Sequence, residues 1–400
     1  MPAHPSMSTP ATPSPKPPVD AMIPEEIFTN ARIVLPDEIV HGTVVVREGR
    51  IADIASGSVQ AGENLDGDTL IPGCVELHTD HLETHLQPRP KVRWNLDAAL
   101  HAHDGQIATS GITTVFDALR VGLEGDTEFA AADMSAMADT IASASAEGRL
   151  RADHFIHLRC EVSVSDVVAH FDAISGNDRV RLASLMDHAP GQRQFVSLEA
   201  YRIYYQGKKK LSDAEFLAYS ERRIAESEVN SDRNRRLIAE RCAGAGIAMA
   251  SHDDATAAHV EESVSLGIGL AEFPTTMEAA KLSRQAGLHV LMGAPNVVRG
   301  GSHSGNVSAL DLLQADALDI LSSDYVPFSL VQAAFLLADR SQTDLPGAIR
   351  LISANPADAA GLSDRGRIEI GRRADLVRVA GTAGRPPRVA AVWREGKRVA

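Results

Sequence analysis

Histidine and carboxylate side chains occur in this sequence at a spacing that suits a divalent metal ion. In the segment Ile71–Trp94, His78 and Asp80 are two residues apart. Successive side chains of a β-strand point to opposite faces, so on a strand these two share one face and can reach one ion. An isolated H-x-D pair is more often two ordinary polar residues on the protein surface. The interpretation therefore depends on whether other segments supply further ligands.

Several later apolar segments end in the same residue types. HLRCE ends in Glu161, SLMDHAPGQRQF contains His188, and SHDDAT contains His252. Further carboxylates at such ends are Asp253, Glu272 and Asp324. Helix capping or a satisfied core histidine explains any one of these residues, but not their repetition at so many segment ends. Imidazole and carboxylate groups suit Zn²⁺ or a similar divalent ion.

The elements that would position these residues alternate along the middle of the chain. Helical stretches are expected over residues 127–147, 164–174, 213–243, 255–266, 277–285 and 330–338. The expected strands are 74–79, 113–117, 155–160, 182–187, 247–251, 268–273, 289–293 and 318–322. This alternation predicts an α/β fold, the (β/α)8 TIM barrel, whose active sites lie at the carboxyl ends of the strands. An open doubly wound sheet is the alternative, but no G-x-G-x-x-G follows the first strand.

The two ends of the chain share a different, β-rich pattern. Residues 27–70 contain short strands and turns, with a hairpin turn at Arg47–Arg50, and residues 366–400 have the same texture. The two ends should therefore meet in one small domain. We expect a disordered tail (residues 1–21), a composite β-sandwich domain (22–72 and 363–400) and a metal-dependent catalytic barrel (73–362).

Composition limits the classes of function. The formal net charge of −14 argues against a nucleic-acid-binding surface. Three cysteines at wide spacing predict reduced thiols in a cytoplasmic protein rather than a disulfide framework. No apolar run is long enough for a transmembrane helix, and the first residues lack the apolar core of a secretory signal, so no membrane partner is expected. The sequence leaves the oligomeric state undecided, with a homodimer as one alternative.

Motifs along the chain resemble the amidohydrolase superfamily. They are the opening PGCVELHTD, the strand-five His252, the strand-eight Asp324 and the closing GRIEIGRRADLV. The resemblance extends from about Ile27 onward and implies a metal-bearing barrel with a β-sandwich built from both termini. Two positions depart from the usual pattern. Asp80 stands in place of the second His of H-x-H, and His188 in place of a bridging Lys.

These departures match a narrower branch of the superfamily. HTDHLETHLQPRP, HLRCE, SLMDHAPGQRQF, SHDDAT, EFPTT and APNVVRGGSHSGN resemble, in order, the motifs of the diphosphatases of the carbon–phosphorus lyase pathway. The resemblance implies hydrolysis of α-D-ribose 1-methylphosphonate 5-triphosphate to the 5-phosphate and pyrophosphate. His81 departs from the Asn expected there and is not counted as a ligand.

Hydrolysis of a phosphoanhydride needs an activated water and charge neutralisation on the phosphoryl oxygens. One or two divalent ions would supply both, with Zn²⁺ as the first candidate and Mn²⁺, Fe²⁺ or Ni²⁺ as alternatives. Glu161 is expected to bridge in place of the missing Lys, Asp324 to accept the proton of the water, and Asp253 and Glu272 to orient the ligands. The expected ligands are His78, Asp80, Glu161, His188, His252 and Asp324.

A phosphorylated small-molecule substrate also needs cations and backbone donors. Arg89, Arg93, Arg193 and Arg299 lie in segments after strand ends. So does Lys208–Lys210, for which a solvated loop is the simpler interpretation. Glycines let backbone N–H groups approach an anion closely, so the segment after Arg299 predicts a phosphate or phosphonate cradle, with an ordinary flexible loop as the alternative. Its residues are Gly300, Gly301, Ser302, His303 and Asn306.

Two rival functions follow from the same residues. Hydrolysis of a cyclic amide, or deamination of a base, needs the metal site but neither the arginines nor the glycine-rich segment. A barrel that serves only as a scaffold is disfavoured, because degenerate relatives of metal enzymes lose their ligands and this chain keeps a full candidate set.

Overall fold

The computed structural model describes residues 25–122, 129–193, 202, 206, 211–302, 305–381 and 385–400. The expected tail, the Lys208–Lys210 run and His303 of the expected cradle lie outside these residues. Within the described ranges, no helix combines the length and the apolar character that a membrane span requires.

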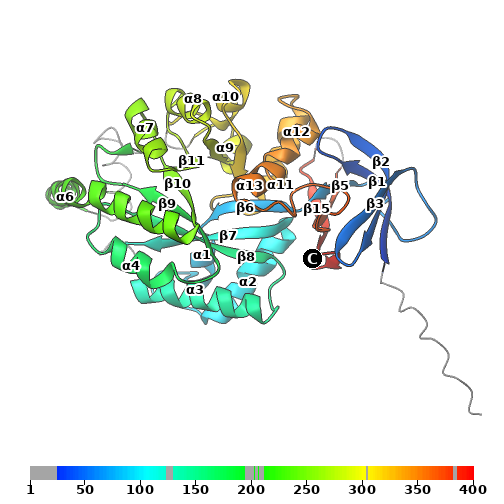
Figure 1. The fold of residues 1–400 in the computed structure, drawn as a ribbon, viewed down its shortest axis with the longest axis horizontal. Helices are drawn as coiled ribbons and strands as arrows, with labels where there is room; N and C mark the ends of the chain where they lie inside the picture. The colour runs from blue at the N-terminus through cyan, green and yellow to red at the C-terminus, as the bar shows by residue number, and fades with distance from the viewer. Residues whose placement is uncertain are drawn as a thin grey trace, which may run out of the picture.

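Eight parallel strands form the larger sheet, and they neighbour one another in chain order (Figure 1). They are β6 (Cys74–Thr79), β7 (Ile112–Val121), β8 (Asp153–Glu161), β9 (Val180–Met186), β10 (Ala248–His252), β11 (Leu270–Glu272), β12 (His289–Gly293) and β13 (Ile320–Ser322). A parallel bridge between Thr79 and Asp324 brings the last strand beside the first. The Thr79 hydroxyl donates to the Asp324 carbonyl at 2.8 Å, and the Ser322 hydroxyl to the His78 carbonyl at 2.7 Å. The predicted TIM barrel is confirmed.

Helices cover the outside of the barrel (Figure 1). The longest, α6, begins at a capping box in which Ser212 and Glu215 satisfy each other's backbone N–H groups. It ends at Gly246, whose φ of 68° is the left-handed conformation that glycine adopts without strain. The helices are α1 (Leu82–Leu86), α2 (Leu96–Thr109), α3 (Ala131–Ala146), α4 (Val167–Ile174), α6 (Asp213–Ala245), α7 (Ala257–Ser265), α8 (Met277–Gln285), α9 (Ala294–Arg299), α10 (Ala309–Gln314), α11 (Ser329–Asp339), α12 (Leu345–Arg350) and α13 (Ala354–Ala359).

Strand alternation divides the apolar core into an inner and an outer layer. On β7, Phe116 packs inside the barrel with Phe155 of β8, whereas Leu119 and Val121 pack outside among the helices. Ile156 of β8 likewise belongs to the outer layer. This assignment matters for the site, because every second residue toward the carboxyl end of a strand enters the barrel mouth.

The two ends of the chain meet in a second, mixed sheet. Its strand order is β16-β15-β14-β5-β1-β2-β3, and β4 pairs with β1. The adjacent strands β5 and β14 run antiparallel and join the two ends, and the predicted hairpin turn at Arg47–Arg50 connects β2 and β3. The strands are β1 (Glu25–Val34), β2 (Ile39–Arg47), β3 (Arg50–Ser56), β4 (Glu63–Asn64), β5 (Thr69–Pro72), β14 (Leu376–Ala380), β15 (Arg388–Arg394) and β16 (Lys397–Arg398).

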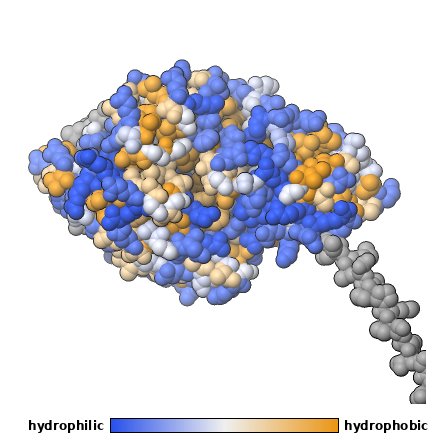
Figure 2. All heavy atoms as spheres, in the orientation of Figure 1, coloured by the Kyte–Doolittle hydropathy of each residue, from blue (hydrophilic) through white to orange (hydrophobic). Residues whose placement is uncertain are grey.

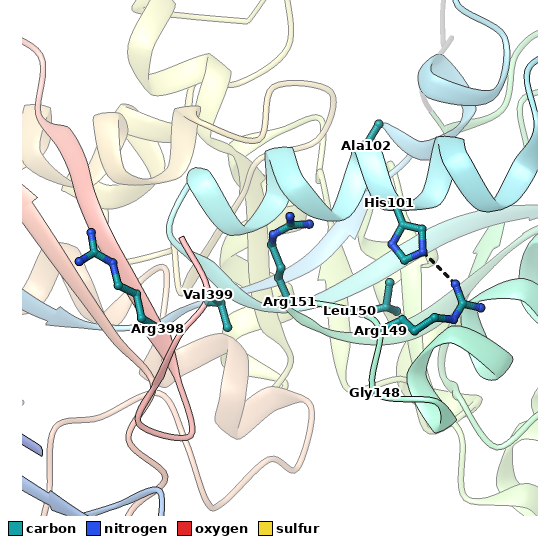
Figure 3. A pocket seen from close by; sticks show the side chains of 8 residues that line it. All are labelled: His101, Ala102, Gly148, Arg149, Leu150, Arg151, Arg398 and Val399. Atoms are coloured by element: carbon teal, nitrogen blue, oxygen red, sulfur yellow. Dashed lines mark hydrogen bonds between the residues drawn. The ribbon is translucent and has the colours of Figure 1, made fainter. Parts of the chain in front are cut away.

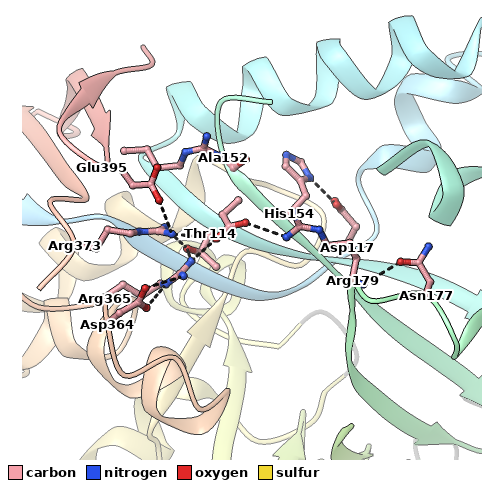
Figure 4. Close-up of polar contacts among 12 residues, drawn as sticks. Thr114, Asp117, Ala152, His154, Asn177, Arg179, Asp364, Arg365, Arg373 and Glu395 are labelled. Carbon is pink, nitrogen blue, oxygen red and sulfur yellow. Dashed lines mark hydrogen bonds and ion pairs between the residues drawn. The ribbon is translucent and has the colours of Figure 1, made fainter. Parts of the chain in front are cut away.

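Figure 4 shows Arg365 and Arg373, in the chain that follows α13, beside Thr114 of the barrel. Asp153 connects the same two parts of the molecule. Its Oδ2 accepts from Arg365 at 2.7 Å and from Arg373 at 3.1 Å, and its Oδ1 accepts from Arg179 at 3.3 Å. Burial acts to raise the pKa of Asp153, but the neighbouring guanidinium groups lower it to about 2. This network lies at the amino-terminal end of β8, the end opposite to the expected site.

The surface has the character expected of a globular protein. Hydrophilic residues cover most of the face in Figure 2, with apolar patches between them. Cys74, Cys160 and Cys242 are buried free thiols.

Candidate active site

Three of the predicted histidines are held by carboxylates at the carboxyl ends of the barrel strands. Glu272, the last residue of β11, lies between two of them. Its Oε1 is 3.2 Å from His78 Nδ1, and its Oε2 is 3.2 Å from His252 Nδ1. Because a carboxylate only accepts hydrogen bonds, each Nδ1 carries a proton and each Nε2 keeps its lone pair. This is how carboxylates orient metal-binding histidines.

His188 has the same arrangement with a different carboxylate. Its Nδ1 donates to Glu161 Oε2 at 2.7 Å, and its backbone N–H donates to Glu161 Oε1 at 3.1 Å. Glu161 Oε1 also accepts from Ser163 at 2.6 Å. Burial opposes ionisation of Glu161, but His188 and Arg223 lower its pKa to about 2. Here Glu161 therefore orients His188, and protein donors occupy both of its oxygens.

The free nitrogen atoms of His188 and His252 face Asp253. Asp253 Oδ2 lies 3.5 Å from His252 Nε2 and 3.8 Å from His188 Nε2, and all three atoms lie within 4.8 Å of one another. This oxygen is buried and has no hydrogen-bond partner. A buried carboxylate oxygen without a donor, facing two imidazole nitrogens, fits a divalent cation. Asp253 was expected to orient ligands, and in this structure its Oδ2 faces both imidazoles directly.

Left-handed backbone occurs directly after three of the strands. The φ angles are 59° at Asp253, 53° at Phe273 and 54° at Asp324, and none of these residues is glycine. Such conformations cost about 1–3 kcal/mol each and concentrate at functional sites. Phe273 contacts the rings of both His78 and His252 edge-on, with centroid distances of 5.1 and 5.4 Å. Its strained backbone thus places an apolar wall against two candidate ligands.

His78 and His252 are neutral in this environment. Burial, helped by the positive charges of Arg159 and Arg120, lowers the pKa of His78 to about 3. Burial also lowers the pKa of His252 to about 3. Neutral imidazole is the form that binds a metal.

Asp80 and Asp324 lie on the side of β6 and β13. Asp80 Oδ2 accepts from Arg159 Nη1 at 3.0 Å, and this guanidinium outweighs burial and holds the pKa of Asp80 below its usual value. Asp324 is half-buried, and its backbone N–H donates to Ser322 Oγ at 3.2 Å. Burial and the negative charge of Asp80 raise the pKa of Asp324 to about 7. Asp324 therefore binds a proton more readily than the neighbouring Asp80.

Strict alternation along β6 is one expectation that needs correction. Strict alternation would place Glu76 on the face that His78 and Asp80 share. The register of β6 against β7 shifts between Glu76 and Thr79. This irregularity lets Leu77 join the inner apolar layer while the adjacent His78 contacts the ring of His252. Glu76 instead accepts from the His78 backbone N–H at 2.7 Å and from Ser322 Oγ at 2.6 Å.

Three of the predicted substrate-binding arginines lie in different surroundings. Arg89 is exposed in a bridged turn with Val92. Arg93 donates to Asp133 at 2.5 Å and lies over the ring of Phe129. Arg193 is buried and paired with Asp254 and Glu262. Of the three, only Arg89 makes no ion pair with a described residue.

The glycines of the expected phosphate cradle cap the carboxyl end of helix α9. The backbone N–H groups of Gly300 and Gly301 donate to the Asn296 carbonyl at 3.1 and 2.9 Å. Gly300 has a φ of 81° and follows the last residue of α9, Arg299, which is exposed. These two N–H groups therefore cap the helix in this structure and do not point to an anion. Ser302 and Asn306 are both half-buried in the chain that follows.

Two residues of the barrel mouth were not among the predictions. His157 lies beneath His78, with centroids 5.0 Å apart, and its ring nitrogens contact the Leu77 carbonyl at 3.0 Å and Ser184 Oγ at 2.9 Å. Arg120 was missed because β7 was expected to end at Asp117, whereas it continues to Val121. Extending the alternation from Phe116 by two steps would have placed Arg120 inside.

A second group of ligand-type atoms is structural. Asp117 accepts from His103 Nε2 and His154 Nδ1, both at 2.7 Å, between the barrel wall and α2. His154 Nε2 lies 3.3 Å from Asp104, which also accepts from the Arg151 backbone N–H. The carboxylate oxygens of this buried group already accept from protein donors, which supports a structural role, although His103 Nδ1 has no hydrogen-bond partner among the described residues.

The groove in Figure 3 is also separate from the site. It has a volume of about 700 Å³ and is lined by His101, Arg149, Arg151 and Arg398, among others. Arg149 is already paired with Asp97 at 2.7 Å and Glu147 at 2.6 Å. The segment 148–151 precedes β8, so the groove lies at the amino-terminal end of the barrel, away from the histidines.

Comparisons with known proteins agree with this architecture. The profile of the amidohydrolase family matches residues 96–400. The chain is 47% identical over 377 residues to the α-D-ribose 1-methylphosphonate 5-triphosphate diphosphatase of Escherichia coli (strain K12), covering 93% of this chain and 100% of that one.

Solved structures with low sequence identity share the fold. An N-acetyl-D-glucosamine-6-phosphate deacetylase from Mycobacterium smegmatis has a TM-score of 0.61 at 16% identity, covering 94% of this chain and 99% of that chain. A Xaa-Pro dipeptidase has a TM-score of 0.63 at 13% identity, with the same shares covered. The family profile covers most of the chain and the curated relative almost all of it, and the barrel geometry agrees with both. This chain belongs to the amidohydrolase family.

Proposed function

We propose that this protein is a metal-dependent diphosphatase that hydrolyses α-D-ribose 1-methylphosphonate 5-triphosphate to the 5-phosphate and pyrophosphate, in phosphonate catabolism. The observation that carries the proposal is the 47% identity to an enzyme of that name over its whole length. The Glu272-oriented histidines and the unpartnered Asp253 oxygen support the metal dependence.

The residues that would hold the metal form two adjacent sets. His188 and His252, through Nε2, and Asp253, through Oδ2, form the tighter set. His78, Asp80 and Asp324 form the other, on the side of β6 and β13. When bound, one or two divalent ions would lower the pKa of a water and neutralise phosphoryl charge. Zn²⁺ is our first candidate, with Mn²⁺, Fe²⁺ and Ni²⁺ as alternatives, because His and carboxylate ligands suit all four.

Asp324 is our proposed catalytic residue. Its carboxyl group has a pKa of about 7, so near neutral pH it exchanges protons readily. It would take a proton from the attacking water and return one as the product forms. Phe273 would exclude bulk water from one side of the same space, because its ring covers His78 and His252. Glu161 and Glu272 would keep the histidines in the productive tautomer.

The remaining assignments belong to the same proposal. Arg89, Arg93, Arg193 and Arg299, with Gly300, Gly301, Ser302, His303 and Asn306, are proposed for the outer parts of the substrate. For Gly300 and Gly301 this requires the end of α9 to open. We place the protein in the cytoplasm, in keeping with its buried free thiols. The proposed domains are residues 22–72 with 363–400, and residues 73–362.

Chelation and a substrate panel test the proposal. The purified protein should lose activity with a chelator and regain it with a divalent ion. It should release pyrophosphate from the ribose triphosphate and leave hydantoin and dihydropyrimidine rings closed. If a cyclic amide is opened while no pyrophosphate forms, the protein has the rival amidohydrolase activity. If neither reaction occurs with the metal-loaded protein, the proposed enzyme function is wrong.

A further inference from the structure

We propose that Arg120 and Arg159 form a paired guanidinium site that binds a phosphoryl or phosphonate oxyanion of the substrate beside His78 and Asp80. This inference rests on the proposed function, because it names the residues that would recognise the charged group at the same site. Neither arginine was among the predicted substrate-binding residues.

The two arginines are neighbours across two parallel strands. Arg120 of β7 and Arg159 of β8 are partners in the strand register. Register partners of parallel strands lie about 4.8 Å apart and point to the same face. That face is the barrel interior, since Phe116 and Phe155, each four residues earlier on its strand, pack in the inner apolar layer. The positive charges of both arginines also act on His78, which places them near the expected metal site.

Their hydrogen-bond donors are largely unused. Arg159 donates one hydrogen bond within the described part of the chain, from Nη1 to Asp80 Oδ2 at 3.0 Å, and its buried Nε has no partner there. The side chain of Arg120 makes no hydrogen bond or ion pair with any described residue, and its Nε is buried as well. A buried N–H without an acceptor costs about 1–3 kcal/mol, so its presence indicates an acceptor that binds there.

The charges point to an anion as that acceptor. Like charges on directly paired strand residues destabilise a sheet. Within the described part of the chain, only Asp80 forms an ion pair with either arginine, so this repulsion is only partly offset. The other buried arginines near the barrel differ, since Arg365 and Arg373 are each paired with at least two carboxylates. An oxyanion between Arg120 and Arg159 would satisfy the free donors and relieve the repulsion. Guanidinium groups match phosphoryl oxygens with two parallel hydrogen bonds.

Binding of small oxyanions to the metal-loaded protein tests the pair. Calorimetric titrations with inorganic pyrophosphate and with methylphosphonate should be compared between wild type, Arg120→Gln, Arg120→Lys and Arg159→Gln. Arg388→Gln is the matched control, because Arg388 is exposed on β15 and the substitution removes the same charge. Arg120→Gln should weaken binding of at least one oxyanion about 10- to 100-fold, as expected for loss of a charged hydrogen bond. Arg120→Lys should recover part of the loss.

The two anions separate the two ends of the substrate. Weaker binding of pyrophosphate alone assigns the pair to the polyphosphate chain, and weaker binding of methylphosphonate alone assigns it to the phosphonate. Unchanged binding of both in Arg120→Gln overturns the proposal. Thermal unfolding supplies a second readout. Because Arg120 makes no bond with a described residue and repels Arg159, Arg120→Gln should keep or raise the melting temperature, whereas a structural role predicts a decrease.

The proposed function and the paired site can fail separately. Arg120-dependent pyrophosphate binding without turnover of the ribose triphosphate leaves the oxyanion site standing and removes the function. Normal turnover with an unchanged KM in Arg120→Gln, together with unchanged anion binding, removes the site and leaves the function standing.

Discussion

Replacing Glu272 by Gln tests how the barrel prepares its histidines for a metal. The carboxylate accepts from the Nδ1 atoms of His78 and His252, both at 3.2 Å, and is fully buried. A glutamine has one acceptor oxygen and one donor NH2 group. It can keep the bond to one histidine, but its NH2 group requires the other Nδ1 to lose its proton. That ring then carries its proton on Nε2 and cannot bind a metal.

The expected effect is a loss of metal affinity with retention of the fold. Loss of such an orienting partner typically lowers metal affinity about 10- to 100-fold, or about 1.4–2.8 kcal/mol. Glu272→Asp keeps the charge but withdraws it by one methylene, so its effect should be smaller. Glu261→Gln, an exposed site on α7, is the isosteric control and should bind metal as the wild type does.

Competition with a chromophoric chelator measures these affinities, and circular dichroism reports whether each variant is folded. The reasoning is refuted if folded Glu272→Gln binds the ion with the affinity and stoichiometry of the wild type. A decrease of the same size in Glu261→Gln would also contradict it, because that carboxylate touches no candidate ligand.

Three further predictions address the proton acceptor and the buried networks. Asp324→Asn should lower kcat at least about 100-fold with little change in thermal unfolding, because an amide cannot accept the proton of water; substantial residual turnover contradicts the role. Burial opposes a charge on His154, but Asp117 and Asp104 raise the pKa of His154 to about 9, above its value near 6.5 in the unfolded chain. The stabilisation by protonated His154 is therefore complete below about pH 6.5 and is lost as the pH rises through 9. Between pH 6 and pH 9.5, the free energy of unfolding in urea should therefore decrease by up to about 3 kcal/mol more in the wild type than in His154→Gln. Equal decreases would refute this. Asp153→Asn should lower the free energy of unfolding by about 3 kcal/mol, because Arg365 and Arg373 lose a shared partner. The exposed control Asp37→Asn should change it little. Equal effects of the two substitutions would argue against the network.

The architecture was predictable from the sequence because barrel strands leave local signals. Each short apolar segment between helical stretches became a strand, and β6 and β12 have the predicted bounds. The two β-rich ends met in one sheet because complementary edge strands, β5 and β14, were both present. Strand ends were less predictable. The strand β7 was expected to end at Asp117 but continues for four more residues to Val121, so Arg120 was missed.

The sequence could place the candidate residues at strand ends but could not give their contacts. The residues at strand ends follow from the topology of a parallel barrel, so His78, His188 and His252 could be named. Which carboxylate holds which histidine depends on packing between distant segments. Glu272 and His78 are 194 residues apart, and no local pattern links them. The same limit explains why the sequence could not show that Glu161 accepts from His188 or that an Asp253 oxygen faces His188 and His252. The bridging role of Glu161 stays a prediction.

Phosphorus NMR of one reaction tests the central claim most directly. The metal-loaded protein is incubated with α-D-ribose 1-methylphosphonate 5-triphosphate, beside a chelated sample and Asp324→Asn. We predict that the triphosphate resonances are replaced by those of pyrophosphate and a 5-phosphate monoester, while the phosphonate resonance keeps its intensity, and that both control samples stay unchanged. Release of orthophosphate with a diphosphate product, or an unchanged triphosphate in the metal-loaded sample, would contradict the account.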